Sequence, residues 1–110
     1  MISEASIREI IATYTKYGWL LRRVLLTRSS RESMQADVSF NEAPIYDADI
    51  DCAWFSRPPQ PGGVAWELRY LGATPFALVE NADETTPDFE AVLADVPQRL
   101  SSAIAERKAA

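Results

Sequence analysis

The chain has 110 residues, of which 47% are hydrophobic and 25% charged, and its formal net charge is -5. This balance is typical of a soluble folded domain, and it excludes collagen-like, coiled-coil and low-complexity proteins. We therefore expect a single domain over residues 1–110, built around one hydrophobic core.

Two residue types that carry much of enzyme chemistry are scarce. The chain has no histidine, and Cys52 is its only cysteine. Ser-His-Asp, Cys-His and His-metal sites therefore cannot form, and neither can an intrachain disulfide or a Cys-rich metal site. We expect no cofactor, an inert buried thiol at Cys52 and no enzymatic activity, although the last point stays open. No signal-peptide pattern or long apolar run is seen, which predicts a cytoplasmic protein that does not insert into membranes.

Charge is unevenly distributed along the chain. Residues 1–31 hold six basic and two acidic side chains, whereas residues 32–56 and residues 80–96 each hold six acidic side chains and no basic one. Segments of opposite sign in a small domain usually pair with each other, and this is the favoured interpretation. The alternative is a phosphate or nucleic-acid site formed by four arginines of the basic segment, Arg22, Arg23, Arg28 and Arg31. This alternative is less favoured because no phosphate-binding loop or RNA-binding motif accompanies them.

An amphipathic helix is predicted for residues 4–17. Ser6 and Glu9 have the spacing of a capping box, with Ser3 as an alternative cap one turn earlier, and Gly18 provides a left-handed stop. The helix is indicated by apolar residues that share one face: Ile7, Ile10, Ile11, Tyr14 and Tyr17.

Residues 19–27 fit either a helix or a strand, and the preceding Gly18 and the short length favour a strand. On a regular strand Arg22 and Arg23 would point to opposite faces. Residues 28–44 are predicted to be mostly loop, with a short helix or an edge strand at 36–40.

Residues 46–55 alternate strictly between two faces and predict one half-buried strand. Residues 57–63, which contain three prolines and two glycines, predict a stiff turn. Further strands are predicted at 66–70 and 76–80, separated by a turn at 72–75.

A second helix is predicted to begin with Thr86 as its cap, Pro87 in its first turn and Asp88 at its positive end, and its apolar stripe continues to the end of the chain. Pro97 lies inside this stripe, so we expect a kink or a restart capped by Asp95 or Val96. The resulting fold class is α+β. It is a two-layer arrangement of about four antiparallel strands with an N-terminal helix and a kinked C-terminal helix, in the order α-β-β-β-β-α.

Three carboxylates at a spacing of two residues are the sharpest chemical feature: Asp47, Asp49 and Asp51. Oxygen ligands of this kind suit Mg²⁺ or Ca²⁺, but the segment lacks the glycine and glutamate of a calcium-binding loop. A solvated strand face is the favoured interpretation. The alternative is a small ligand- or metal-binding protein, or an enzyme, that uses these aspartates with Arg69 or Arg23.

The function favoured by the sequence is a small acidic, non-catalytic interaction or adaptor module. It would bind a protein partner, or a second copy of itself to form a homodimer, through aromatic, aliphatic and arginine side chains in both strand registers. The candidate surface consists of Trp19, Arg22, Arg23, Phe55, Arg69 and Val79.

Overall fold

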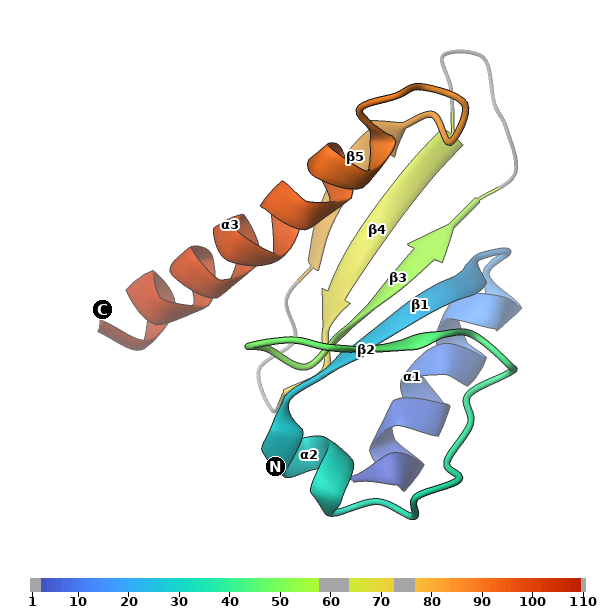
Figure 1. Cartoon of the computed structure of the whole chain (residues 1–110), viewed down its shortest axis with the longest axis vertical. Helices are drawn as coiled ribbons and strands as arrows, with labels where there is room; N and C mark the ends of the chain where they lie inside the picture. The colour runs from blue at the N-terminus through green and yellow to red at the C-terminus, as the bar shows by residue number, and fades with distance from the viewer. Residues whose placement is uncertain (1–2, 58–63, 73–76, 110) are drawn as a thin grey trace.

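The computed structural model describes residues 3–57, 64–72 and 77–109, which form an α+β fold with a five-stranded mixed sheet and a helix near each end (Figure 1). Its elements in chain order are α1 (Glu4–Lys16), β1 (Leu20–Leu26), α2 (Arg28–Glu32), β2 (Ile45–Asp47), β3 (Cys52–Ser56), β4 (Val64–Tyr70), β5 (Ala77–Ala82) and α3 (Phe89–Ala109).

The strand order is β2-β1-β3-β4-β5. β1 pairs in parallel with the short edge strand β2, and the remaining pairs are antiparallel. The prediction of a four-stranded antiparallel meander is therefore wrong. The alternating segment 46–55 is two strands, because β2 ends at Asp47 and β3 begins at Cys52 on the other side of β1. Residues 48–51 connect them, which alternation along the sequence does not reveal.

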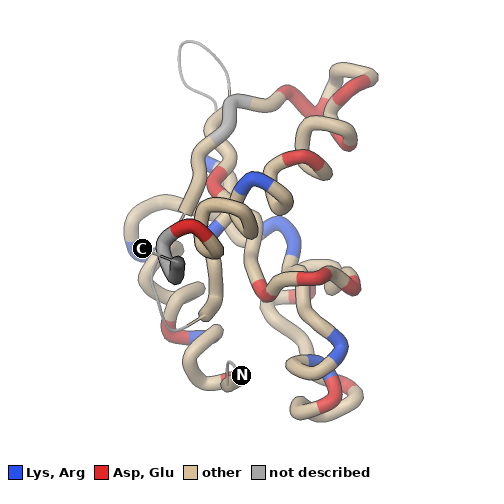
Figure 2. The backbone as a smooth tube through the Cα atoms, turned by 90° about the vertical axis from the view of Figure 1, so that its left-hand side faces the viewer, with Lys and Arg blue, Asp and Glu red and all other residues tan. Residues whose placement is uncertain are grey.

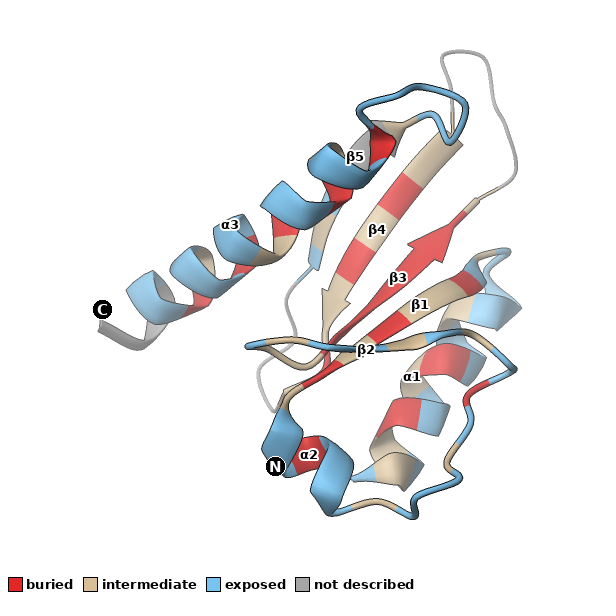
Figure 3. Cartoon of the chain, viewed as in Figure 1, coloured by how far each residue is buried: buried red, intermediate tan, exposed pale blue. Residues whose placement is uncertain are grey.

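The molecule has three layers, because α1 and α3 lie on opposite faces of the sheet (Figure 1). The expected two-layer arrangement is wrong for this reason. Every residue of the central strand β3 is buried, whereas we expected a half-buried strand (Figure 3). The α1 side of the core contains Ile7, Ile11, Leu21, Val24, Leu26, Phe40, Ala53, Phe55 and Leu71. The α3 side contains Cys52, Trp54, Trp66, Leu68, Phe89, Leu93, Val96, Leu100 and Ile104.

The structure corrects the predicted N-terminal cap of α1 and confirms its predicted C-terminal stop. Ser3, and not Ser6, is the cap: its hydroxyl oxygen accepts a hydrogen bond from the Ser6 backbone N–H at 3.1 Å. Gly18 follows the helix with φ of +89°, a conformation that favours glycine, and confirms the predicted stop.

The segment between β1 and β2 contains a helix that the sequence pattern did not predict. Thr27 caps α2 by accepting a hydrogen bond from the Ser30 N–H. The expected helix or strand at 36–40 does not form, and Phe40 is buried against α1 instead. A tight turn follows, in which Asn41 and Glu42 have φ of 51° and 62° and the Ala43 N–H donates to the Phe40 carbonyl.

The C-terminal helix begins later than expected, at Phe89. Thr86 does not cap it, because the cap position is the residue directly before Phe89, and the Thr86 hydroxyl donates to the Asp83 carbonyl instead. The helix continues through Pro97 as one element, so the expected restart is wrong. Burial of Val96, Leu100 and other residues of the stripe on the sheet outweighs the hydrogen bond that proline removes.

The predicted turns at 57–63 and 72–75 lie largely outside the described residues. The antiparallel pairing of β3 with β4 and of β4 with β5 confirms that the chain reverses in both places. Within the described part of the chain, no helix combines the length and apolar character needed to cross a bilayer.

Candidate functional site

Part of the sheet is left open on the side that faces α3. α3 packs against β4 and β5, and no other described helix lies over β1 and β2 on that face (Figures 1 and 3). Leu20 and Tyr46 are 63% and 46% exposed there, and Leu25 is half-buried. Large apolar side chains therefore face solvent on two adjacent strands.

Both arginines of β1 also point to this face because the strand contains a bulge. Leu21 lies opposite Phe55 and Arg23 opposite Trp54, so Arg22 is an extra residue with no partner of its own on β3. A bulge breaks the alternation of side chains, and it turns Arg22 and Arg23 to the same side. The prediction that they point to opposite faces is wrong, since that rule holds only for a regular register.

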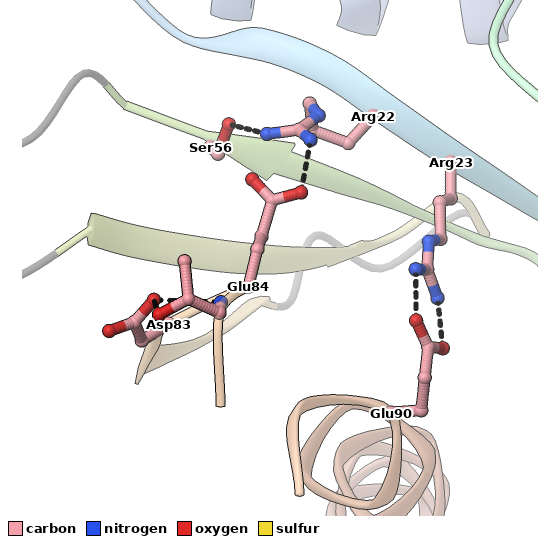
Figure 4. Close-up of polar contacts among 7 residues, drawn as sticks. Arg22, Arg23, Ser56, Asp83, Glu84 and Glu90 are labelled. Carbon is pink, nitrogen blue, oxygen red and sulfur yellow. Dashed lines mark hydrogen bonds and ion pairs between the residues drawn. The ribbon is translucent and has the colours of Figure 1, made fainter. Parts of the chain in front are cut away.

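Arg23 forms a bidentate salt bridge with Glu90 of α3. Its two terminal nitrogens donate to the two carboxylate oxygens of Glu90 at 2.9 and 2.7 Å (Figure 4). The guanidinium also lies 5.7 Å from the ring centroids of Tyr46 and Phe89. The hydrogen bonds raise the pKa of Arg23 and lower the pKa of Glu90, so both groups are charged at neutral pH.

Arg22 makes a second link from the sheet to the segment that precedes α3. It donates to the Ser56 hydroxyl at 3.2 Å and to the Glu84 carboxylate at 2.8 Å (Figure 4). Its guanidinium lies 4.7 Å from the centroid of the buried Trp66 ring. These contacts confirm the expectation that basic and acidic segments pair with each other in this part of the molecule.

We call Leu20, Arg22, Arg23, Leu25 and Tyr46 the β1 surface. The segment that leads into α3 is acidic (Figure 2), and we call its four carboxylates, Asp83, Glu84, Asp88 and Glu90, the acidic rim; of these, Glu84 and Glu90 contact Arg22 and Arg23. Hydrogen bonds from Thr85 lower the pKa of Asp83, as Arg23 does for Glu90. These two carboxylates are therefore ionised at neutral pH.

The other residues of the predicted interaction surface lie on the opposite face. Phe55 is buried and stacks on Tyr14 with ring centroids 4.1 Å apart, so the expected exposed stripe at Phe55 is wrong: α1 covers it. Trp19 is half-buried against the edge of the same tyrosine. Val79 is 60% exposed, and Arg69 is half-buried. The structure therefore separates Trp19, Phe55, Arg69 and Val79 from Arg22 and Arg23.

A polar contact anchors α1 on this opposite face. The Tyr14 hydroxyl donates to the Glu67 carboxylate of β4. Burial and the neighbouring carboxylate raise the pKa of Tyr14, which stays neutral. Its position beside Phe55 makes this a structural contact between helix and sheet.

The three aspartates do not share a strand face. Asp51 accepts hydrogen bonds from the Thr27 N–H at 2.8 Å and the Ser30 hydroxyl at 2.6 Å, which fixes the start of α2. Asp47 lies in β2 and Asp49 in the connection that follows. Among the described residues, no three acidic, histidine or cysteine side chains are placed to hold a metal ion.

Two of the four candidate arginines and two of the three candidate aspartates line one mixed-charge cavity beside α2. The cavity has a volume of about 600 Å³ and is lined by Arg28, Arg31, Glu32, Asp47, Ala48 and Asp49. Arg31 lies 3.4 Å from Asp47, and Arg28 lies 3.3 Å from Glu32. Both arginines of this cavity therefore pair with a carboxylate, and Asp49 leaves its lining with a net charge of -1. Cys52 is buried, and burial raises the pKa of its thiol, which makes it a poor nucleophile.

Sequence reasoning missed Leu20, Leu25 and Tyr46 as surface residues. It placed Tyr46 on the apolar face of a longer strand, and no sequence signal marked the bulge. The only pointer to Glu84 and Glu90 was the acidic segment at 80–96 opposite the basic N-terminal third. No protein-family model, curated protein or solved structure matches the chain.

Proposed function

We propose that this chain is a non-catalytic protein-interaction module and that its β1 surface docks a protein partner. The observation that carries the proposal is the exposure of Leu20 and Tyr46, 63% and 46%, on the same open half of the sheet with two arginines between them. Tyrosine and arginine are enriched at the energetic centres of protein interfaces. Apolar side chains that share one uncovered face mark a binding surface more strongly than scattered ones.

The β1 surface is also pre-organised. Arg22 is held by Ser56 and Glu84, and Arg23 by both oxygens of Glu90. Ordering a long side chain on binding costs about 0.5–1.5 kcal/mol, and these two side chains are ordered before a partner arrives. The aliphatic stems of the arginines extend the apolar area between Leu20 and Tyr46.

The chemistry of this surface supports binding over catalysis. A general acid or base works best with a pKa near the operating pH. Arg23 lowers the pKa of Glu90, and so moves it away from that range. Arginine and leucine side chains supply no nucleophile, and the chain has no histidine to activate the Tyr46 hydroxyl, so the surface suits recognition.

The test is quantitative co-purification from the source cells with a tagged chain. Leu20→Ser and Tyr46→Ser should each deplete a specific partner, whereas Val79→Ser should retain it. Val79 is a matched control because it is 60% exposed on the opposite face. Circular dichroism and thermal melting should show that all three variants stay folded. Retention of the same partners by all three variants, or the absence of any specific partner, would contradict the proposal.

A further inference from the structure

The two arginines of the β1 surface are already occupied by carboxylates of the same chain. Glu84 and Glu90 lie within 2.8 and 2.7 Å of Arg22 and Arg23. The exposed fractions of the side chains differ: 30% and 22% for the arginines against 49% and 72% for their glutamate partners. The carboxylates of these pairs are therefore more accessible to an approaching molecule than the arginine side chains.

The local charge around the β1 surface is also negative. Glu84 and Glu90 neutralise the two arginines, and the exposed Asp83 and Asp88 of the same segment bring the charge of the arginines and the acidic rim together to -2. The whole chain, at -5, adds a field of the same sign at longer range. The exposed side of this site therefore repels anions, which disfavours at Arg22 and Arg23 the phosphate or nucleic-acid site that is the less favoured alternative for the arginines.

We infer that the partner of the β1 surface is a short, basic amphipathic segment of another protein. This inference rests on the proposed function above. Its apolar side chains would cover Leu20 at one end and Leu25 and Tyr46 at the other, and its lysines or arginines would face the acidic rim. Leu20 and Leu25 are five residues apart, or about 16 Å along the strand. A segment of about eleven residues spans that distance as a helix, and about five residues span it when extended.

An unbiased peptide selection tests whether the β1 surface prefers a positively charged partner. A random dodecapeptide library displayed on phage is panned against the immobilised full chain, and the enriched peptides are sequenced. We expect peptides with net positive charge and at least two large apolar residues. Their affinity should fall about tenfold or more for Leu20→Ser, should be unchanged for Val79→Ser, and should weaken when salt rises from about 50 mM to about 300 mM.

A charge-reversed variant gives the sharpest control. The substitutions Glu84→Gln, Asp88→Asn and Glu90→Gln leave two arginines against one carboxylate, so the local charge becomes +1. Panning against this variant should enrich acidic peptides. Circular dichroism checks that the variant is folded, and Asp88→Asn alone, which leaves both arginine pairs in place, should weaken the basic peptides without reversing the selection.

The outcomes separate this inference from the proposed function. Acidic or neutral peptides that lose affinity for Leu20→Ser would overturn the inference and leave the docking function standing. No enrichment, or peptides insensitive to Leu20→Ser, would overturn both. A homodimer in sedimentation that dissociates in Leu20→Ser would show that a second copy occupies the surface, and it would also overturn the inference.

Discussion

Replacing Asp51 by alanine should destabilise the fold far more than replacing Asp49, although the two residues are neighbours in the same acidic pattern. The Asp51 carboxylate accepts hydrogen bonds from the Thr27 N–H and from the hydroxyl of Ser30, which is 2% exposed. Asp49 is exposed and lines the cavity beside α2. Only Asp51 therefore satisfies buried polar groups.

The magnitude follows from these two hydrogen bonds. A hydrogen bond to a charged group contributes about 1.5–3 kcal/mol, and a buried donor left without a partner costs about 1–3 kcal/mol. Partial exposure of Asp51 lets water replace some of this interaction, so we expect Asp51→Ala to lose about 2–4 kcal/mol. Asp51→Asn keeps one acceptor oxygen and should lose about half as much. Asp49→Ala should stay within about 0.5 kcal/mol of the original chain.

Urea unfolding followed by tryptophan fluorescence measures these differences, because Trp54 and Trp66 are both buried. The dependence of the unfolding free energy on urea should be the same in all variants, which shows that the folded and unfolded states are comparable. Equal stability of Asp51→Ala and Asp49→Ala would refute the assignment of Asp51 to the α2 contact.

Four further predictions concern backbone strain, pH and the buried thiol. Glu42→Gly should stabilise the chain by about 1 kcal/mol in the same urea assay, because Glu42 holds φ at +62° where glycine is not strained; a loss of stability would count against the turn geometry. The contact between Arg23 and Glu90 should contribute its full stabilisation at pH values above 4.5, the ordinary glutamate pKa. This contribution should be lost as the pH falls through the lowered pKa of Glu90. Melting temperatures from pH 6 to pH 3 should therefore fall less steeply for Glu90→Gln, and parallel curves would contradict this. At high pH, the raised pKa values of Tyr14 and Cys52 mean that stability is full below the unfolded pKa values of 10.0 and 9.0 and declines above them. Cys52 should react with a thiol reagent only at the rate of unfolding, and rapid labelling of the folded chain would show that the thiol is accessible.

The parts of the fold that the sequence predicted are those with a long, regular pattern. The apolar stripe of residues 4–17 and the stripe that starts at Phe89 identify α1 and α3, because a helix buries one face along its whole length. The alternation of Trp66, Leu68 and Tyr70 identifies β4 for the same kind of reason. These patterns report local burial, which does not depend on strand order.

The site depends on features that local burial does not encode. Alternation at 46–55 separates two faces but does not show that the chain leaves β2 at Asp47 and crosses β1 before β3. The bulge at Arg22 depends on the register with β3, and only that register places both arginines beside Glu84 and Glu90. The sequence also does not show that α1 covers Phe55 while α3 leaves Tyr46 exposed. The sequence therefore identified Arg22 and Arg23 as surface residues, but it did not predict which candidate residues lie on the α1 face of the sheet and which on the α3 face.

Site-specific photo-crosslinking in the source cells tests the docking role of the β1 surface most directly. A photoreactive phenylalanine analogue replaces Tyr46, which is an exposed aromatic already, and a second version carries it at Val79 on the opposite face. We predict a discrete covalent adduct with one partner protein from position 46 and none from position 79. The same adducts from both positions, or no adduct from position 46, would contradict the account.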